Sequence, residues 1–313
     1  MRHRVLHGDG ATTSELVLGT WGLAGLGYGA VDEGTLEAVV SRAAEHGVTL
    51  VDTAEHYGSV LVQLAPLLAK LPQVGLMVRV GVRLVDGRLV RNLARERVSD
   101  GVRTTVAASG RPRLDVALLH TPTPEELREG GCVEAMRECV RAGLVRTWGA
   151  SVTGVPEAHA AIDAGALVVA LPFHAFHQPV FRAIASRARG RGVRVIAHSV
   201  LAYGLLAGRW SPGHRFADDD HRAERWTPAE LTTRIEHLEL LKRLVRGEVH
   251  GLRSAALRYV LDQEGITAAI VGPRSVAQLD ELVRDIAHIE GAALPIEDVV
   301  AFEALARARG LID

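Results

Sequence analysis

The stretch LVDTAEHYGS, residues 50–59, joins an apolar run to polar residues where a strand is expected to end. The run VTLVD begins at Val48 and stops at Asp52, and Tyr57 follows five residues later. A short apolar run bounded by polar and turn residues is typical of a strand that is buried on both faces. Asp52 at its end either caps the strand or faces a site that other segments complete.

Seven other apolar runs alternate with helical patterns along the 313 residues. They are LVLGT at 16, VGLMVRV at 74, LDVALLH at 114, VRTWGAS at 145, LVVAL at 167, VRVIAHS at 193 and TAAIVG at 267. The segments between them are amphipathic, as in residues 32–47, where Leu36, Val39, Val40 and Ala43 follow helical spacing. Eight strands that alternate with helices predict parallel pairing, so we expect an α/β fold, a (β/α)8 barrel forming a single domain over residues 1–313.

A doubly wound open sheet is the alternative, and it would need a phosphate-binding glycine turn after an early strand. The segment GLAGLGYG, residues 22–29, has glycines at 22, 25, 27 and 29 but no ordered G-x-G-x-x-G that opens a helix. The next helical pattern begins only near Asp32. We therefore interpret residues 22–29 as a loop over the mouth of the barrel.

The composition favours a small-molecule or protein partner. The chain has 36 basic and 37 acidic residues, so no overall charge attracts nucleic acid or an anionic membrane. No apolar run reaches the roughly 18 residues of a spanning helix, and the N-terminal residues lack the apolar region of a signal peptide, so we expect a cytoplasmic protein.

Cys132 and Cys139 lie seven residues apart in a helical pattern, about two turns, and are expected to be free thiols.

The one irregular region is residues 209–228, which are polar and charged. In a barrel this segment is a long βα loop at the catalytic rim, where it could cover a substrate. A solvated surface excursion is the alternative interpretation.

Polar side chains stand at or just after the ends of several predicted strands. In a (β/α)8 barrel the carboxyl ends of the strands meet at one rim, which carries the chemistry. Each polar residue could instead cap its own strand, as aspartate and serine often do. The residues that the barrel brings to this rim are Asp52, Tyr57, Arg79, His120, Ser151, His198 and Ser199.

Several of these segments match a known family. VDTAEHYG resembles the D-T-A-x-x-Y-G motif of the aldo-keto reductases, and LDVALLH resembles the strand that carries the family's histidine. GLVRTWGAS is similar to the segment before its serine-asparagine pair, and VIAHSVLAYGLLAGR to its pyrophosphate-binding strand and loop. The resemblance runs from LVLGTWG to IVGPRSVAQLDELV, nearly the whole chain.

The resemblance implies hydride transfer from a nicotinamide to a carbonyl. Tyr57 would be the general acid, Asp52 its supporting carboxylate, and His120 the residue that orients the carbonyl. The family's lysine is Arg79 in this chain, which keeps the positive charge but has a longer, planar head that cannot lose its proton. Either arginine replaces lysine in a slower enzyme, since the chain has only two lysines, or the barrel has been reused.

The resemblance also implies NADPH as cofactor. Arg209 and Arg274 are the natural partners of a 2′-phosphate. The residues expected to contact the cofactor are Ser151, His198, Ser199, Leu201, Gly204, Arg209, Gly272, Arg274, Gln278 and Glu281. Four positions depart from the family: Val152 for asparagine, Leu171 for glutamine, His198 for the stacking aromatic residue and Leu282 for asparagine.

The substrate pocket is expected to be lined by Trp21, Tyr28, His56, Phe173 and His174 together with the long loop. Histidines 56, 120, 174, 177 and 198 could crowd one cavity, but their spacing follows no zinc pattern and we predict no metal. Proton transfer by His56 or His198 would suit an isomerase, lyase or cyclase.

Three functions follow from these observations. The first is NADPH-dependent reduction of an aldehyde or ketone. The second is acid-base chemistry without hydride transfer on the same barrel, and the third is a protein that holds a nucleotide through Arg209 and Arg274 without turning it over. The resemblance implies a monomer.

Overall fold

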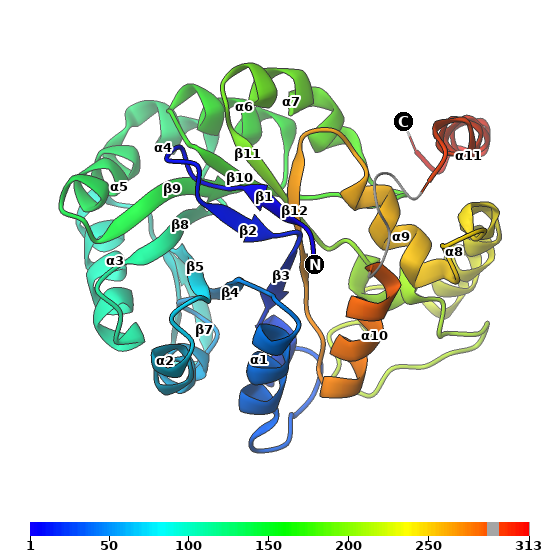
Figure 1. Ribbon diagram of the computed structural model, residues 1–313, viewed down its shortest axis with the longest axis horizontal. Coiled ribbons are helices and arrows are strands. Elements are labelled where there is room, and N and C mark those ends of the chain that lie inside the picture. The colour runs from blue at the N-terminus through cyan, green and yellow to red at the C-terminus, as the bar shows by residue number, and fades with distance from the viewer. Residues whose placement is uncertain (287–293, 313) are drawn as a thin grey trace.

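Eight parallel strands form a closed barrel, as predicted (Figure 1). In this computed structural model, which describes residues 1–286 and 294–312, each strand pairs with the next and the last pairs with the first. They are β3 (Leu16–Gly19), β4 (Leu50–Ala54), β5 (Gly75–Val80), β8 (Leu114–His120), β9 (Val145–Ser151), β10 (Val168–Pro172), β11 (Arg194–His198) and β12 (Ile266–Val271). All eight apolar runs of the sequence are therefore strands of one barrel.

The strands are buried on both faces because side chains on alternate positions point into the barrel or toward the surrounding helices. Leu50, Met77, Val116 and Ile196 belong to a separate apolar cluster that includes residues of seven barrel strands. One close approach requires glycine: a Cβ on Gly149 would lie 2.0 Å from the carbonyl oxygen of Val168 on the neighbouring strand. The barrel interior is thus a packed core rather than a channel.

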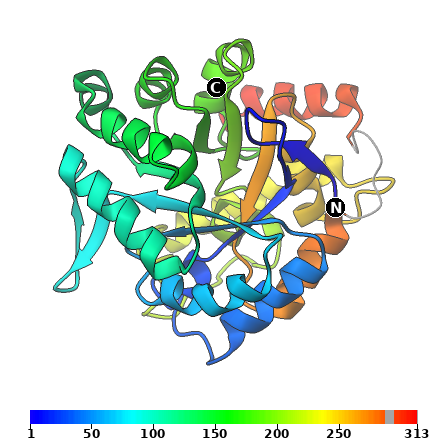
Figure 2. The same ribbon diagram turned by 60° about the vertical axis from the view of Figure 1, so that its left-hand side comes forward.

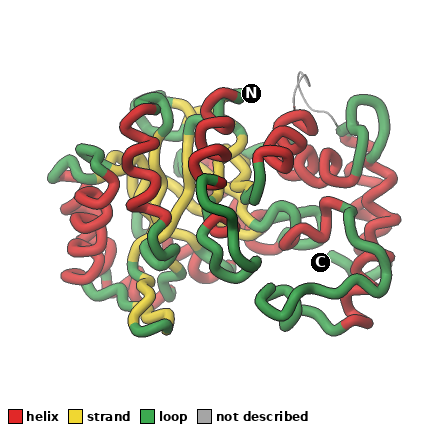
Figure 3. Tube along the Cα trace, turned by 90° about the horizontal axis from the view of Figure 1, so that it is seen from below, coloured by secondary structure: helices red, strands yellow, loops and turns green. Residues whose placement is uncertain are grey.

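Helices surround the strands, which Figure 3 shows in yellow between red helices. In α1 the four predicted apolar residues, Leu36, Val39, Val40 and Ala43, are all buried. The helices are α1 (Thr35–Glu45), α2 (Val60–Lys70), α3 (Arg95–Ser109), α4 (Pro124–Glu129), α5 (Gly131–Arg141), α6 (Val155–Asp163), α7 (Pro179–Gly190), α8 (Pro228–Leu241), α9 (Leu252–Leu261), α10 (Val276–Ile286) and α11 (Ile296–Ala308).

Two hairpins and three short 3-10 helices were not predicted. The hairpin of β1 (His3–Val5) and β2 (Thr12–Ser14) precedes the barrel, and Leu6 beside it joins the apolar cluster inside the barrel. The hairpin of β6 (Val82–Val85) and β7 (Arg88–Arg91) projects from the molecule, cyan in Figure 2. The 3-10 helices are η1 (Trp21–Leu23), η2 (Ala202–Ala207) and η3 (Lys242–Leu244).

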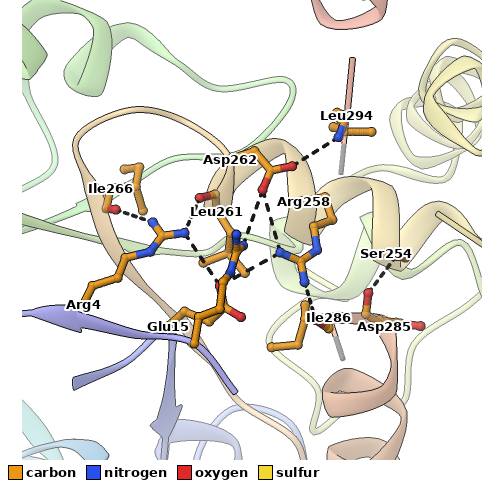
Figure 4. A network of polar contacts seen from close by, with 11 residues as sticks. Arg4, Glu15, Ser254, Arg258, Leu261, Asp262, Ile266, Asp285, Ile286 and Leu294 are labelled. Atoms are coloured by element: carbon orange, nitrogen blue, oxygen red, sulfur yellow. Dashed lines mark hydrogen bonds and ion pairs between the residues drawn. The ribbon is translucent and has the colours of Figure 1, made fainter. Parts of the chain in front are cut away.

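A network of buried charges ties the segment before β3 to α9 (Figure 4). Arg258 of α9 is fully buried, with Nη1 4.0 Å from Glu15 Oε2 and 3.7 Å from Asp262 Oδ1. Arg4 donates hydrogen bonds to the carbonyl oxygens of Leu261 at 2.7 Å and Ile266 at 2.6 Å. Removing one charge from such a group costs far more than removing a surface charge, because its partner stays buried.

Cys132 and Cys139 lie on α5 as two buried free thiols, as predicted. Across the described part of the chain, no helix combines the length and apolarity needed to cross a bilayer.

Candidate active site

The carboxyl ends of the barrel strands open into a cavity of about 550 Å³. Its walls include the four residues that the resemblance assigns to catalysis, Asp52, Tyr57, Arg79 and His120. Trp21 and Tyr28, two of the five expected substrate contacts, also line it. The ten expected cofactor contacts all lie on the same walls: Ser151, His198, Ser199, Leu201, Gly204, Arg209, Gly272, Arg274, Gln278 and Glu281.

One nitrogen of Arg79 bridges Asp52 and Tyr57. Nη1 of Arg79 lies 3.0 Å from Asp52 Oδ2 and donates a hydrogen bond to Tyr57 Oη, also at 3.0 Å. All three side chains are buried. Asp52 does not end its strand as expected, because β4 continues to Ala54. Asp52 is two positions beyond Leu50, which faces the barrel interior, so alternation turns the carboxylate inward as well.

Burial and pairing act in opposite directions on this group. Burial raises the pKa of Asp52 to about 6, although the Arg79 charge pulls it down. Burial likewise raises the pKa of Tyr57 against the effect of Arg79. Burial disfavours the charge on Arg79, but Asp52 and Tyr57 outweigh it and the pKa of the guanidinium is raised. Arg79 is therefore a permanent cation next to a protonated phenol.

The histidines of this region are neutral at neutral pH. Burial, followed by the nearby Arg79 charge, lowers the pKa of His120 to about 3 and that of His198 to about 3. The same two causes lower the pKa of His56 to about 4. The His56 ring lies 4.7 Å from the Tyr57 ring and 5.1 Å from the His120 ring, measured between centroids. His56 thus packs behind the cavity wall and supports the residues that form it.

Three of the expected substrate contacts do not line the cavity: His56, Phe173 and His174. Phe173 is fully buried, with its ring 4.6 Å from the Phe181 ring of α7, so it faces the helix layer. His174 and His177 exchange backbone hydrogen bonds of 3.1 and 2.8 Å, which fold the loop after β10 onto itself. Among the described residues, no three histidine, cysteine, aspartate or glutamate side chains gather in a way that could hold a metal.

The positions that depart from the family differ in their placement. Val152 and Leu171 are fully buried in the apolar core and are not on the cavity wall, whereas Leu282 and His198 are. His198 Nδ1 lies 3.1 Å from Ser199 Oγ. Thr153 lines the cavity two positions beyond Ser151, and sequence reasoning missed it. Thr121, also missed, lines it directly after His120.

The backbone is strained in two loops at the rim of the barrel, after β8 and after β11. Ser199, Ala202 and Tyr203 have positive φ angles of 57°, 46° and 61°, and Thr121 has 50°. Non-glycine residues avoid this region unless the surrounding structure imposes it, and such residues concentrate at functional sites.

The long loop, residues 208–227, lies between η2 and α8 and covers part of the cavity. Its residue His221 donates a backbone hydrogen bond to Gly27 O at 2.8 Å, and Asp220 forms a bridge with Tyr28. Two loops that are far apart in the sequence are therefore joined over the site. Trp210 and Arg222 of the long loop line the cavity, and sequence reasoning singled out neither.

Arg222 is the centre of this covering layer. Its Nε lies 2.8 Å from Asp220 Oδ1, and its guanidinium carbon lies 4.7 Å from the Tyr28 ring centroid. The rings of Phe216 and Trp210 lie 4.9 and 5.4 Å from the same carbon. Cation–π contacts and the ion pair thus hold both loops together.

The far end of the cavity is rich in arginine. Arg274 donates to the carbonyl oxygens of Gly29 at 3.0 Å and Ala30 at 2.8 Å in the first loop. Glu281 Oε2 accepts from both Arg209 and Arg253, the latter at 2.7 Å. Arg253 lines the cavity and is a further residue that sequence reasoning missed, because nothing in the local pattern of α9 marks it.

Comparison with known proteins identifies the family of the chain. The model of the Aldo/keto reductase family matches residues 15–305. The chain is 26% identical to the aldo-keto reductase YhdN of Bacillus subtilis (strain 168), over 95% of this chain and 91% of that protein.

Solved structures share the fold. The glycerol dehydrogenase AKR11B4 from Gluconobacter oxydans superimposes with a TM-score of 0.85 at 21% identity, covering 97% of this chain and 95% of that one. The holo form of the aldo-keto reductase AKR11C1 from Bacillus halodurans gives a TM-score of 0.80 at 19% identity, with coverages of 97% and 96%. Because the family model matches most of the length of this chain, the chain belongs to the aldo/keto reductase family.

Proposed function

We propose that the protein reduces an aldehyde or ketone with NADPH as the hydride donor. The observation that carries this proposal is the bridge from Asp52 through Arg79 to Tyr57, on the wall of a cavity that also holds the expected cofactor contacts. A phenol beside a fixed positive charge is an acid whose conjugate base is stabilised where it forms.

The residues present fit a nicotinamide dinucleotide. The cavity walls extend from Tyr57 to Arg274, Gln278 and Glu281 of the arginine-rich end. The hydroxyls of Ser151 and Thr153 are candidates to hold the carboxamide, in place of the amides lost at Val152 and Leu171. Arg209 and Arg274 are candidates to hold a 2′-phosphate. When bound, the dinucleotide supplies the hydride.

Tyr57 supplies the proton. Because a guanidinium can only donate hydrogen bonds, Tyr57 Oη accepts from Arg79 and keeps its own proton for the carbonyl oxygen of the substrate. When that O–H bond breaks, the electron pair stays on the phenolate, 3.0 Å from Arg79, and the new O–H bond completes an alcohol. Tyr57 then regains a proton from water. His120, neutral and on the same wall, orients the carbonyl.

The substrate is proposed to be a mid-sized aromatic or apolar carbonyl compound. Trp21, Tyr28, Tyr203 and Trp210 give the cavity an aromatic wall near the covering loops. Such walls bury apolar ligands. Arg222 is already paired with Asp220, which removes the obvious partner for a substrate carboxylate.

The proposal is tested by following the absorbance of NADPH with benzaldehyde and with glyceraldehyde. We expect NADPH oxidation that is faster with benzaldehyde. Tyr57→Phe is expected to lower kcat by about 10²–10⁴, because the proton donor is lost while the ring and its packing remain. Binding of NADPH without oxidation by any aldehyde or ketone, or a Tyr57→Phe variant as active as the wild type, would refute the proposal.

A further inference from the structure

We propose that Arg253, through its ion pair with Glu281, makes one end of the cavity selective for a dinucleotide that carries a 2′-phosphate. This is the arginine-rich end described above, where the adenosine of the cofactor would bind, and it is called the adenosine end below. This inference deepens the proposed function and rests on it. It assigns to Arg253 a positioning role, because the residue acts by neutralising Glu281 so that Arg209 stays available to the phosphate.

Arg253 is held in place by two carboxylates of α10. It lies in the first turn of α9 and lines the cavity, with only 19% of its side chain exposed. Nη1 lies 2.7 Å from Glu281 Oε2, and Nε donates to Asp285 Oδ2. Glu281 and Asp285 are one turn apart on α10, so both carboxylates face α9. The neighbouring Ser254 donates to the Asp285 carbonyl at 2.8 Å, which Figure 4 shows.

Arg209 reaches the same carboxylate oxygen but is held less firmly. It lies two residues beyond the end of η2 on the long loop, and 55% of its side chain is exposed. Exposed ion pairs contribute little to stability, so Arg209 can exchange Glu281 for another anion at small cost. Arg253 remains as the constant partner of Glu281 when Arg209 leaves.

The charge balance decides which ribose is accepted. An unpaired carboxylate at this position would accept a hydrogen bond from a free ribose 2′-hydroxyl and would repel a 2′-phosphate. On the cavity wall, Arg209 and Arg253 both face the single carboxylate of Glu281, which leaves one net positive charge in this group. Without Arg253 the positive and negative charges of this group cancel, and Glu281 loses its constant partner.

The test measures binding by calorimetry with four probes: NADPH, NADH, adenosine 2′,5′-bisphosphate and 5′-AMP. The last two occupy only the adenosine end. In Arg253→Gln we expect the Kd of NADPH and of the bisphosphate to rise about tenfold, the factor for about 1.4 kcal/mol of lost charge compensation. The Kd of NADH and of 5′-AMP is expected to change less than about twofold, because neither carries the phosphate.

Two further variants separate charge from packing. Asp285→Asn removes the other anchor of Arg253 and leaves its ion pair with Glu281 in place. Because Asp285 does not line the cavity, we expect the ratio of NADPH affinity to NADH affinity to stay as in the wild type. The double variant Arg253→Gln/Glu281→Gln removes both the neutralising charge and the charge that it neutralises. We expect it to regain most of the NADPH affinity, which a purely structural defect would not allow.

Three results would overturn the inference: equal weakening of all four probes by Arg253→Gln, no recovery in the double variant, or no preference of the wild type for the bisphosphate over 5′-AMP. Failure of the proposed function looks different. A wild type that prefers the bisphosphate in an Arg253-dependent way, yet oxidises no NADPH, would refute the reductase and support the role of Arg253.

Discussion

Arg79 Nη1 lies 3.0 Å from Tyr57 Oη and 3.0 Å from Asp52 Oδ2, so a single nitrogen serves both partners. The arginine in the position of the family's lysine therefore keeps the link between carboxylate and phenol. The arginine changes only the distribution of the positive charge. A guanidinium spreads this charge over three nitrogens, whereas an ammonium concentrates it on one.

Arg79→Lys is expected to raise kcat for carbonyl reduction severalfold. A compact ammonium stabilises the developing phenolate of Tyr57 more strongly than a delocalised cation at the same distance. The measurement is NADPH oxidation at saturating aldehyde, and Arg243→Lys, an exposed arginine of η3, is the matched control with no expected change. A fall in kcat for Arg79→Lys would mean that the site depends on the fork of arginine.

His56 should make the protein less stable in mild acid. Its pKa is about 4 in the folded state against an ordinary 6.5, so between these values the unfolded state binds the extra proton. Stability therefore falls as pH decreases through this window, by up to about 1.4 kcal/mol per pH unit from this group.

His56→Gln should flatten that dependence, measured as the difference from wild type in urea unfolding at several pH values. The difference is the informative quantity because Asp52, whose pKa is raised to about 6, acts in the opposite sense between 3.8 and 6. Above neutral pH both proteins should show the same slope. Parallel curves across the acid window would contradict the burial of a neutral His56.

Arg222→Lys should loosen the covering loops. Lysine keeps the charge but cannot form the two-pronged pair with Asp220 or lie flat among the rings of Tyr28, Trp210 and Phe216. We expect faster proteolysis within residues 208–227 and a severalfold higher Kd for NADPH, with the melting temperature nearly unchanged. Arg215→Lys, an exposed arginine of the same loop, is the control. Equal proteolysis of both variants would show that Arg222 does not hold the loop.

Glu15→Gln should lower the free energy of unfolding by about 3–5 kcal/mol, because fully buried Arg258 loses one of its two carboxylates. Activity per folded molecule should stay unchanged, since Glu15 lies at the opposite end of the barrel from Tyr57. Glu134→Gln, which breaks a surface pair with Arg141, should leave the free energy of unfolding nearly unchanged. Similar losses in chemical denaturation of the two variants would argue against the buried network.

The sequence by itself determined the eight strands, the closed barrel and the residues at its rim. These follow from local patterns: apolar runs of strand length, helical spacing as in α1, and a polar residue near the end of a run, as with His120. The hairpin of β6 and β7 also had a local signal, the turn Asp86-Gly87 between apolar runs, with positive φ at both residues, and it could have been predicted.

Only the tertiary structure decided which side chains reach the cavity. Phe173 follows a strand end but faces α7, whereas Arg253, in a helix with no distinguishing pattern, lines the site beside Glu281. Such contacts depend on the rotation of each helix and the register of each strand, which are set by the packing of the whole barrel. A local sequence pattern encodes the element and its buried face but not its neighbour across the fold.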